Sequence, residues 1–86
     1  MAKKLVRKAV QPKEEGSKDL KKVGERLKHY RRKAGYTSSE YFAYENGISR
    51  PQYGKYEAGA NIQLNTLIKI LKAMGVSLEE FFKGFD

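Results

Sequence analysis

The segment 38–57 constrains the fold most, because it has the pattern of two short helices joined by a tight turn. Ala43 is small at a point where two helices must cross closely, and Gly47 can adopt the left-handed backbone that ends a helix. Ile48 supplies an apolar residue for the turn. We therefore expect one short helix to end at about Glu45 and the turn to occupy residues 46–49.

The second short helix has its own start signal. Ser49 suits the N-cap, where a side-chain oxygen accepts a backbone N–H of the first turn. Pro51 is tolerated in that turn because its N–H groups lack intrahelical partners. The pattern predicts a helix over about 50–56.

Apolar spacing predicts three further helices. Positions three and four apart repeat over about 18–33 and again over 64–74, which places apolar residues on one face of each helix. The first repeat comprises Leu20, Val23, Leu27, Tyr30 and Ala34, and the second comprises Leu64, Leu67, Ile68, Leu71 and Met74. Ser77 is suited to cap a last helix over about 78–83. The predicted fold class is all-α, with five helices.

Composition bounds the remainder of the architecture. A chain of 86 residues allows one small domain, and the absence of cysteine fits a reducing compartment. Residues 1–17 mix lysines with Pro12 and Gly16, so we expect a flexible basic arm there and a globular domain over 18–86. The apolar runs are too short for a membrane helix. We expect a cytoplasmic protein without a membrane partner.

The formal net charge of +8 favours an anionic partner. Attraction to phosphates is the common use of such an excess of lysine and arginine. The arm is predicted either to be solvated without a specific partner or to contact DNA phosphates or the minor groove.

The ordered motifs resemble those of the lambda-repressor-like, Xre-type helix-turn-helix domains over roughly residues 20–82. The matching motifs are Gly24 with Arg26-Leu27, Arg31 followed by Gly35, Phe42-Ala43, Gly47-Ile48-Ser49, Glu57 with Gly59, Leu67 to Leu71, and Met74 to Ser77. The resemblance implies a five-helix DNA-binding domain. Its function is then expected to be sequence-specific transcription regulation.

The resemblance also implies that the helix 50–56 is the recognition helix in the DNA major groove. Arg50, Gln52 and Lys55 would then face base edges. Arginine or lysine can bridge two acceptors of guanine, and glutamine can pair with adenine in the same way. For each residue the alternative is a phosphate contact or simple solvation.

Phosphate contacts are implied for residues around the start of the first short helix and in two loops. Ser39 holds the family position that meets phosphate at that helix start, where backbone N–H groups favour an anion. The full set of candidates is Ser38, Ser39, Asn61, Tyr36 and Lys33. Ordinary surface polarity, or core packing for Tyr36, is the alternative role.

Arg31 and Glu57 match the family's partly buried ion pair, which ties the first helix to the end of the recognition helix. A planar guanidinium can hold a carboxylate through two charge-assisted hydrogen bonds. Tyr53 and Tyr56 lie on the inward face of the recognition helix by their spacing, so we expect them in the core.

Three departures from the family pattern affect these expectations. The segment between Thr37 and Ala43 is one residue longer than usual, so Ser38 and Ser39 are interchangeable as cap and phosphate contact. Asn46 stands where relatives place leucine, and either it caps the helix or a neighbouring tyrosine, Tyr41 or Tyr44, fills the missing volume. Pro51 and Gly54 narrow the base-reading surface.

A single recognition helix has few contacts, so we expect a homodimer on a palindromic site. Phe81, Phe82 and Phe85 favour a dimer if the short last helix cannot bury all of them, although two buried rings and one exposed ring are the alternative. A second function class is an antitoxin-like module that binds a protein partner and regulates its own operon. We expect no enzymatic activity, cofactor or metal, because the residues lack a catalytic constellation and the one histidine, His29, lies on the surface.

Overall fold

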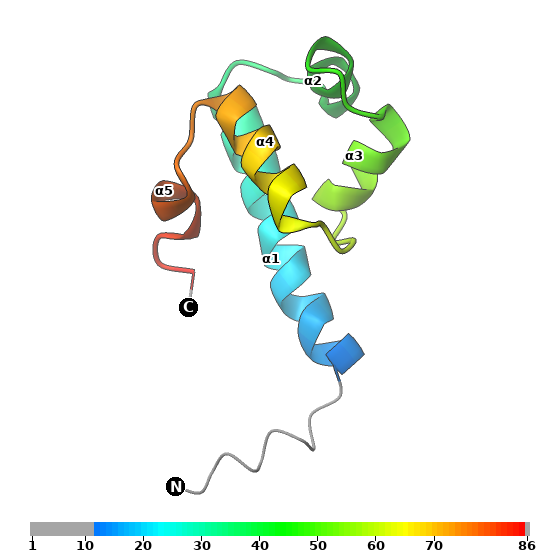
Figure 1. Cartoon of the computed structure of the whole chain (residues 1–86), viewed down its shortest axis with the longest axis vertical. Coiled ribbons are helices and arrows are strands. Elements are labelled where there is room, and N and C mark those ends of the chain that lie inside the picture. Colours follow the sequence, from blue (N-terminus) through cyan, green and yellow to red (C-terminus); the bar gives the residue numbers. More distant parts are fainter. Residues whose placement is uncertain (1–11, 86) are drawn as a thin grey trace, which may run out of the picture.

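The computed structural model describes residues 12–85, with side chains from Lys18 onward. It contains five helices, α1 (Pro12–Lys33), α2 (Ser39–Glu45), α3 (Arg50–Glu57), α4 (Leu64–Met74) and α5 (Leu78–Phe82). In Figure 1 the pair α2–α3 lies to one side of the long α1 and α5 lies to the other, with α4 across the front. The expected all-α, five-helix class is confirmed.

Helix α1 begins at Pro12, earlier than the expected start near Lys18. Proline is favoured in the first turn of a helix, and Glu14 and Glu15 follow it where the helix dipole favours negative charge. Residues 12–17, which we assigned to the arm, are therefore helical. The rest of the predicted arm, residues 1–11, lies outside the described residues, and the division between arm and domain stays a prediction.

One apolar cluster holds the helices together. Its buried members come from all five helices: Val23, Leu27, Phe42, Ala43, Tyr53, Leu67, Ile70, Leu71, Met74 and Phe81. Ala34 and Leu64, which the apolar spacing placed on the apolar faces of their helices, are exposed instead. Ala34 lies just beyond the end of α1, and Leu64 is the first residue of α4. At the ends of a helix the inward face no longer has a neighbour to cover it.

The helix ends follow the local signals closely. Ser38, rather than Ser39, caps α2 by accepting the N–H of Tyr41 at 3.1 Å, and Ser49 caps α3 by accepting the N–H of Gln52 at 3.3 Å. Asn46 is the C-cap of α2, and its side-chain amide donates to the carbonyl of Phe42 at 2.9 Å. Asn46 thus caps the helix instead of leaving a volume for a tyrosine to fill.

The C-terminal phenylalanines pack against their own chain. Phe81 is fully buried, and Phe82 and Phe85 are half-buried against the core cluster. Their rings form successive edge-to-face contacts, with centroids 4.9 Å and 5.2 Å apart. One ring is thus buried and two are half-buried, so the alternative of two buried rings and one exposed ring is not observed, and the dimer stays a prediction.

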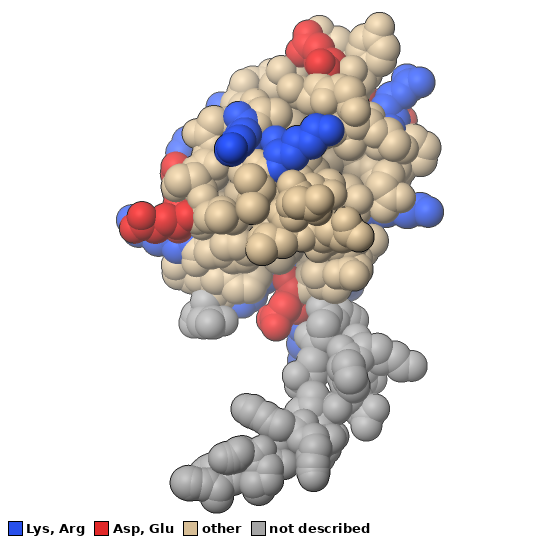
Figure 2. All heavy atoms as spheres, viewed as in Figure 1, with Lys and Arg blue, Asp and Glu red and all other residues tan. Residues whose placement is uncertain are grey.

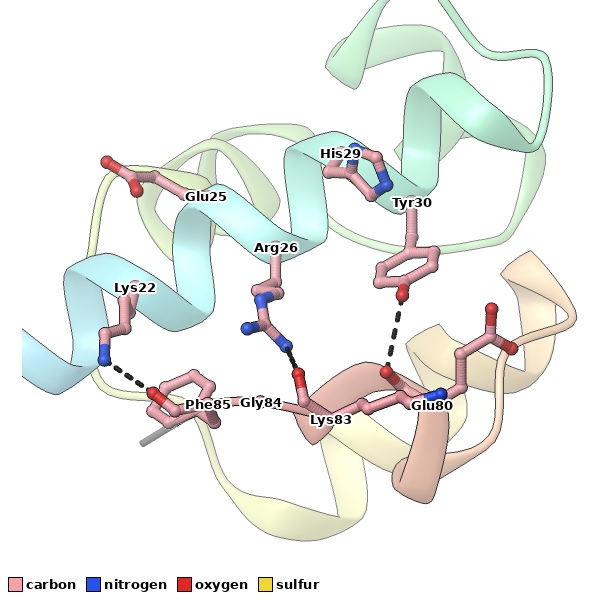
Figure 3. Close-up of a pocket in the computed structure, with 9 residues that line it drawn as sticks. All are labelled: Lys22, Glu25, Arg26, His29, Tyr30, Glu80, Lys83, Gly84 and Phe85. Atoms are coloured by element: carbon pink, nitrogen blue, oxygen red, sulfur yellow. Dashed lines mark hydrogen bonds between the residues drawn. The ribbon is translucent and has the colours of Figure 1, made fainter.

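The backbone of α5 and of the residues that follow it is held by side chains from α1 (Figure 3). Lys22 donates to the carbonyl of Phe85 at 2.7 Å, and Tyr30 donates to that of Glu80 at 3.3 Å. Arg26 donates to the carbonyls of Phe81 and Lys83, the latter at 3.0 Å. The carbonyls at the end of a helix lack intrahelical donors, and these three side chains supply them.

Candidate nucleic-acid interface

Helices α2 and α3 are joined by a short, hydrogen-bonded turn. The N–H of Ile48 donates to the carbonyl of Ala43 at 2.8 Å, and Gly47 has a φ of 68°. Ala43 is completely buried where the two helices meet. The turn therefore has the geometry expected from Ala43, Gly47 and Ile48.

Helix α3 has one inward and one outward face. Tyr53 is fully buried, and Tyr56 is half-buried against the core, as predicted. Arg50, Gln52 and Lys55 are all exposed. The three residues expected to face bases thus share the solvent side of one helix.

Pro51 and Gly54, where this chain departs from the family pattern, leave the solvent side of α3 accessible. Pro51 is exposed in the first turn, and a Cβ added at Gly54 would meet no atom within 4 Å. Gly54 is therefore not required by packing within the domain.

The phosphate candidates divide into two groups. Ser38, Asn61 and Lys33 are exposed, and Ser39 is half-buried as the first residue of α2. The Ser38 oxygen accepts the cap hydrogen bond of α2, so Ser38 has the cap role and the phosphate role of Ser39 stays a prediction. Tyr36 differs, since it is half-buried with its ring 5.0 Å from that of Phe42.

The Tyr36 hydroxyl is committed to a carboxylate. It donates to Oε1 of Glu45 at 2.9 Å, and Tyr41 donates to Oε2 of the same carboxylate at 2.9 Å. The hydrogen bond that Tyr41 donates to Glu45 is also the main cause that raises the pKa of Tyr41 above its ordinary value. A negative charge beside the Tyr36 hydroxyl opposes a phosphate contact there, which favours its alternative role in packing.

Arg31 and Glu57 form a buried ion pair between α1 and the last residue of α3. Nε of Arg31 donates to Oε2 of Glu57 at 2.8 Å, and the second guanidinium nitrogen donates to Oε1 at 3.2 Å. The side chains are only 4% and 9% exposed. A third donor of Arg31 reaches the carbonyl of Tyr36 at 2.9 Å. The hydrogen bond to Glu57 raises the pKa of Arg31 above its ordinary value, so the guanidinium stays charged.

Tyr53 lies beside this pair with an unpartnered hydroxyl. It is the one buried side-chain polar atom without a hydrogen bond among residues 18–85. Burial, and to a lesser extent the Glu57 carboxylate, raises the pKa of Tyr53 well above its ordinary value. The phenol therefore stays neutral and contributes to α3 as an apolar ring.

Gly24 allows α1 and α3 to approach closely. A Cβ built at Gly24 would lie 2.8 Å from the backbone carbonyl carbon of Glu57 and from the carbonyl oxygen of Tyr56. No real Cβ contact is that short, so only glycine fits. Gly24 and the ion pair together determine how the end of α3 lies on α1.

Two exposed tyrosines of α2 were not among the expected site residues. Tyr41 is 54% exposed and Tyr44 is 69% exposed, and they flank the buried pair Phe42 and Ala43. The Arg50 guanidinium carbon lies 6.0 Å from the centre of the Tyr44 ring. The helical spacing could have predicted this exposure. Tyr41 and Tyr44 lie at positions of the helix that cannot face the core, so their rings must face solvent.

The charges are spread over the surface. On the face shown in Figure 2, uncharged atoms predominate over α4, and basic side chains lie at its upper part and around its margins. In the portion that the structure covers, no group of three metal-ligating side chains occurs. Within the same portion, no helix combines the length and the apolar character needed to cross a membrane.

Comparison with known proteins identifies the family. A family model described as "Helix-turn-helix" matches residues 27–81, a stretch that runs from the middle of α1 to α5. The chain belongs to the lambda-repressor-like, Xre-type helix-turn-helix family. The resemblance drawn from the sequence motifs is therefore confirmed.

A relative of this helix-turn-helix family carries a descriptive name. Over 62 residues the chain is 47% identical to the SPbeta prophage-derived uncharacterized HTH-type transcriptional regulator YonR of Bacillus subtilis (strain 168). The match covers 71% of this chain and 56% of the relative. The chain thus spans little more than half the length of that relative. No solved structure matches the chain.

Proposed function

We propose that this chain is a sequence-specific transcription regulator that binds double-stranded DNA with α3 in the major groove. The observation that carries the proposal is that Arg50, Gln52 and Lys55 of α3 are exposed while Tyr53 of the same helix is buried. A helix fits the major groove, and these three residue types form hydrogen bonds with base edges. The net charge of +8 supplies the nonspecific attraction to phosphates.

The roles proposed for the individual residues follow the family resemblance. Arg50 is the main base reader, with Gln52 and Lys55 as further base contacts. Ser39 and Asn61 bind phosphates, and Ser38 and Lys33 add weaker contacts. The pair Arg31–Glu57 touches no base and holds the end of α3 on α1.

We further propose that the protein acts in the cytoplasm as a homodimer, without catalysis. Two recognition helices about 34 Å apart would enter successive major grooves on one side of the duplex. The relative is named as a transcriptional regulator, which supports the same function for this chain. No observation favours the antitoxin-like alternative.

Selection of bound sites from a random DNA pool tests the proposal. We expect a recovered motif with two-fold symmetry. Arg50→Ala should then relax the preference at one base position per half-site, whereas Ser39→Ala should weaken all duplexes about equally. Recovery of no motif at moderate salt would contradict the proposed function.

A matched control separates base reading from loss of charge. Lys83→Ala removes the same unit charge as Arg50→Ala, but Lys83 follows α5, on the far side of α1 from α3 (Figure 1). We expect this variant to lower affinity slightly for every duplex and to leave the motif unchanged. Equal loss of preference from both variants would refute the assignment of Arg50.

A further inference from the structure

Arg50 and Tyr44 face each other across the turn between α2 and α3. Both residues line a shallow depression at the end of α2, together with Ser38, Glu40 and Tyr41. The guanidinium carbon of Arg50 lies 6.0 Å from the centre of the Tyr44 ring. Arg50 is the first residue of α3, so its side chain starts at the junction of the two helices.

The other ring in this depression is held elsewhere. Tyr41 donates its hydroxyl to Glu45 at 2.9 Å, and its ring lies 6.1 Å from that of Tyr36. The Tyr44 ring is 69% exposed and is the one that stands beside Arg50. The two tyrosines therefore differ in environment although they lie one turn apart on the same helix.

The kind of contact matters for the donors of Arg50. Within residues 18–85 the one ion pair is Arg31–Glu57, so no carboxylate in that range pairs with the Arg50 guanidinium. A guanidinium over an aromatic face keeps the N–H groups at its edge free, whereas a carboxylate would occupy them. A stacked Arg50 thus keeps the fork that reads guanine.

We propose that Tyr44 is a positioning residue that determines the specificity of Arg50, because its ring holds the guanidinium in the orientation needed at a base edge. This inference rests on the proposed function. A long arginine side chain on an exposed helix start loses rotamer freedom when it reads a base, and a ring that restricts it beforehand reduces that loss. The benefit appears only at the base that Arg50 contacts.

Competition binding with the selected duplex and its single-base variants tests this inference. Tyr44→Ala should reduce the preference at the Arg50 position by about two- to five-fold, the size of an exposed cation–π contact, and leave the other positions unchanged. Tyr44→Phe retains the ring and should keep the preference. Tyr41→Ala is the matched control on the same helix and should also keep it.

A double-mutant cycle makes the assignment specific. In an Arg50→Ala background, Tyr44→Ala should have no further effect on base preference, because nothing remains for the ring to position. The salt dependence of binding should be unchanged by Tyr44→Ala, since no phosphate contact is lost. Thermal unfolding of each variant should match the parent, because the ring is exposed.

Three results would overturn the inference. Equal weakening of all duplexes by Tyr44→Phe and Tyr44→Ala would assign the hydroxyl to a phosphate, and persistence of the Tyr44→Ala effect without Arg50 would remove the coupling. If the parent shows a base preference and Tyr44→Ala leaves it unchanged, this inference is refuted and the proposed function is not. A parent without any base preference would instead refute the proposed function.

Discussion

Helix α1 contacts α3 and the C-terminal segment 78–85 in two chemically different ways. Toward α3 it uses Gly24 and the buried pair Arg31–Glu57, so the contact depends on residue type on both sides. Toward the C-terminal segment it uses three donors, Lys22, Arg26 and Tyr30, which all bind backbone carbonyls. Every residue has a carbonyl, so these hydrogen bonds depend on residue type on one side only, although Lys22 and Arg26 also lie beside the ring of Phe85.

The difference indicates what each contact contributes. A bidentate pair between buried side chains fixes both distance and angle, as the recognition helix requires. Donors to carbonyls satisfy the end of α5 and hold the chain near α1, with less control of orientation. We therefore expect damage to the first contact to lower both stability and DNA binding, and damage to the second to remain local.

Breaking the ion pair should have the largest effect. Glu57→Gln leaves the buried Arg31 guanidinium without its counter-charge, which should lower the free energy of unfolding by about 3–5 kcal/mol. Denaturant unfolding measures the change, and Glu25→Gln, an exposed change of the same type on α1, is the control. A loss as small as that of the control would show that the pair contributes little to holding α3.

Adding a side chain at the close contact between α1 and α3 should have the second-largest effect. Gly24→Ala places a methyl group against the backbone of Tyr56 and Glu57, and we expect a loss of about 1–3 kcal/mol. Gly54→Ala is the opposite case, because its Cβ meets open space and alanine favours a helix by roughly 0.5–1 kcal/mol. Thermal unfolding of both variants should therefore shift in opposite directions, and shifts of the same sign would contradict the close approach at Gly24.

Loosening the C-terminal contact should have a smaller and local effect. Arg26→Ala removes donors from the carbonyls of Phe81 and Lys83 and a cation 5.3 Å from the Phe85 ring. We expect a loss of about 1–2 kcal/mol, seen as faster hydrogen exchange of the amides in 81–85, with DNA affinity lowered no more than the loss of one positive charge at Lys28 lowers it. Lys28→Ala on the same helix is the control. A larger fall in DNA affinity would show that the two contacts are coupled.

Removing the Tyr53 hydroxyl should have the smallest effect at neutral pH. Because that hydroxyl lacks a partner, Tyr53→Phe should change the free energy of unfolding by less than about 0.5 kcal/mol at pH 7. The pKa of Tyr53 is raised from 10.0 in the folded state, so the native protein retains this proton longer than the unfolded chain. The stability that the neutral Tyr53 phenol contributes to the folded state is present below the unfolded pKa of about 10, and it is lost as the pH rises above that value. The Tyr53→Phe variant should therefore become more stable relative to the parent only above about pH 10. If the free energies of unfolding of variant and parent changed in parallel with pH, that result would contradict the burial of the phenol.

The features that depend on neighbouring residues were predictable from the sequence. Ser49 and Ser77 cap their helices, and Gly75 adopts the left-handed conformation at the end of α4, because these signals act within one turn of backbone. The motif match also placed Arg31 opposite Glu57. The start of α1 was missed because residues 12–17, which contain Pro12 and Gly16, were grouped with the lysines that precede them, and this grouping outweighed the signal from Pro12 at a helix start.

The features that depend on tertiary packing were not predictable in the same way. Backbone carbonyls carry no residue signature, so nothing in the sequence marks them as partners of Lys22 and Arg26. The burial of Phe85 depends on those cations as well as on the core, because the Lys22 ammonium lies 4.7 Å from its ring. The shared carboxylate of Glu45 needs Tyr36, from the loop before α2, to reach the same group as Tyr41, which lies one turn from Glu45 on α2.

Both contacts of α1 originate from the same short run, residues 22–31. The residues that contact α3 are interspersed there with those that contact the C-terminal segment. Each residue of an α-helix advances the side-chain direction by about 100°. Inserting or deleting one residue inside this run would rotate Arg31 away from Glu57 while Gly24 still faced the end of α3. The length of this run is thus as strictly defined as its residues, and loops elsewhere are the places where homologous chains can change length.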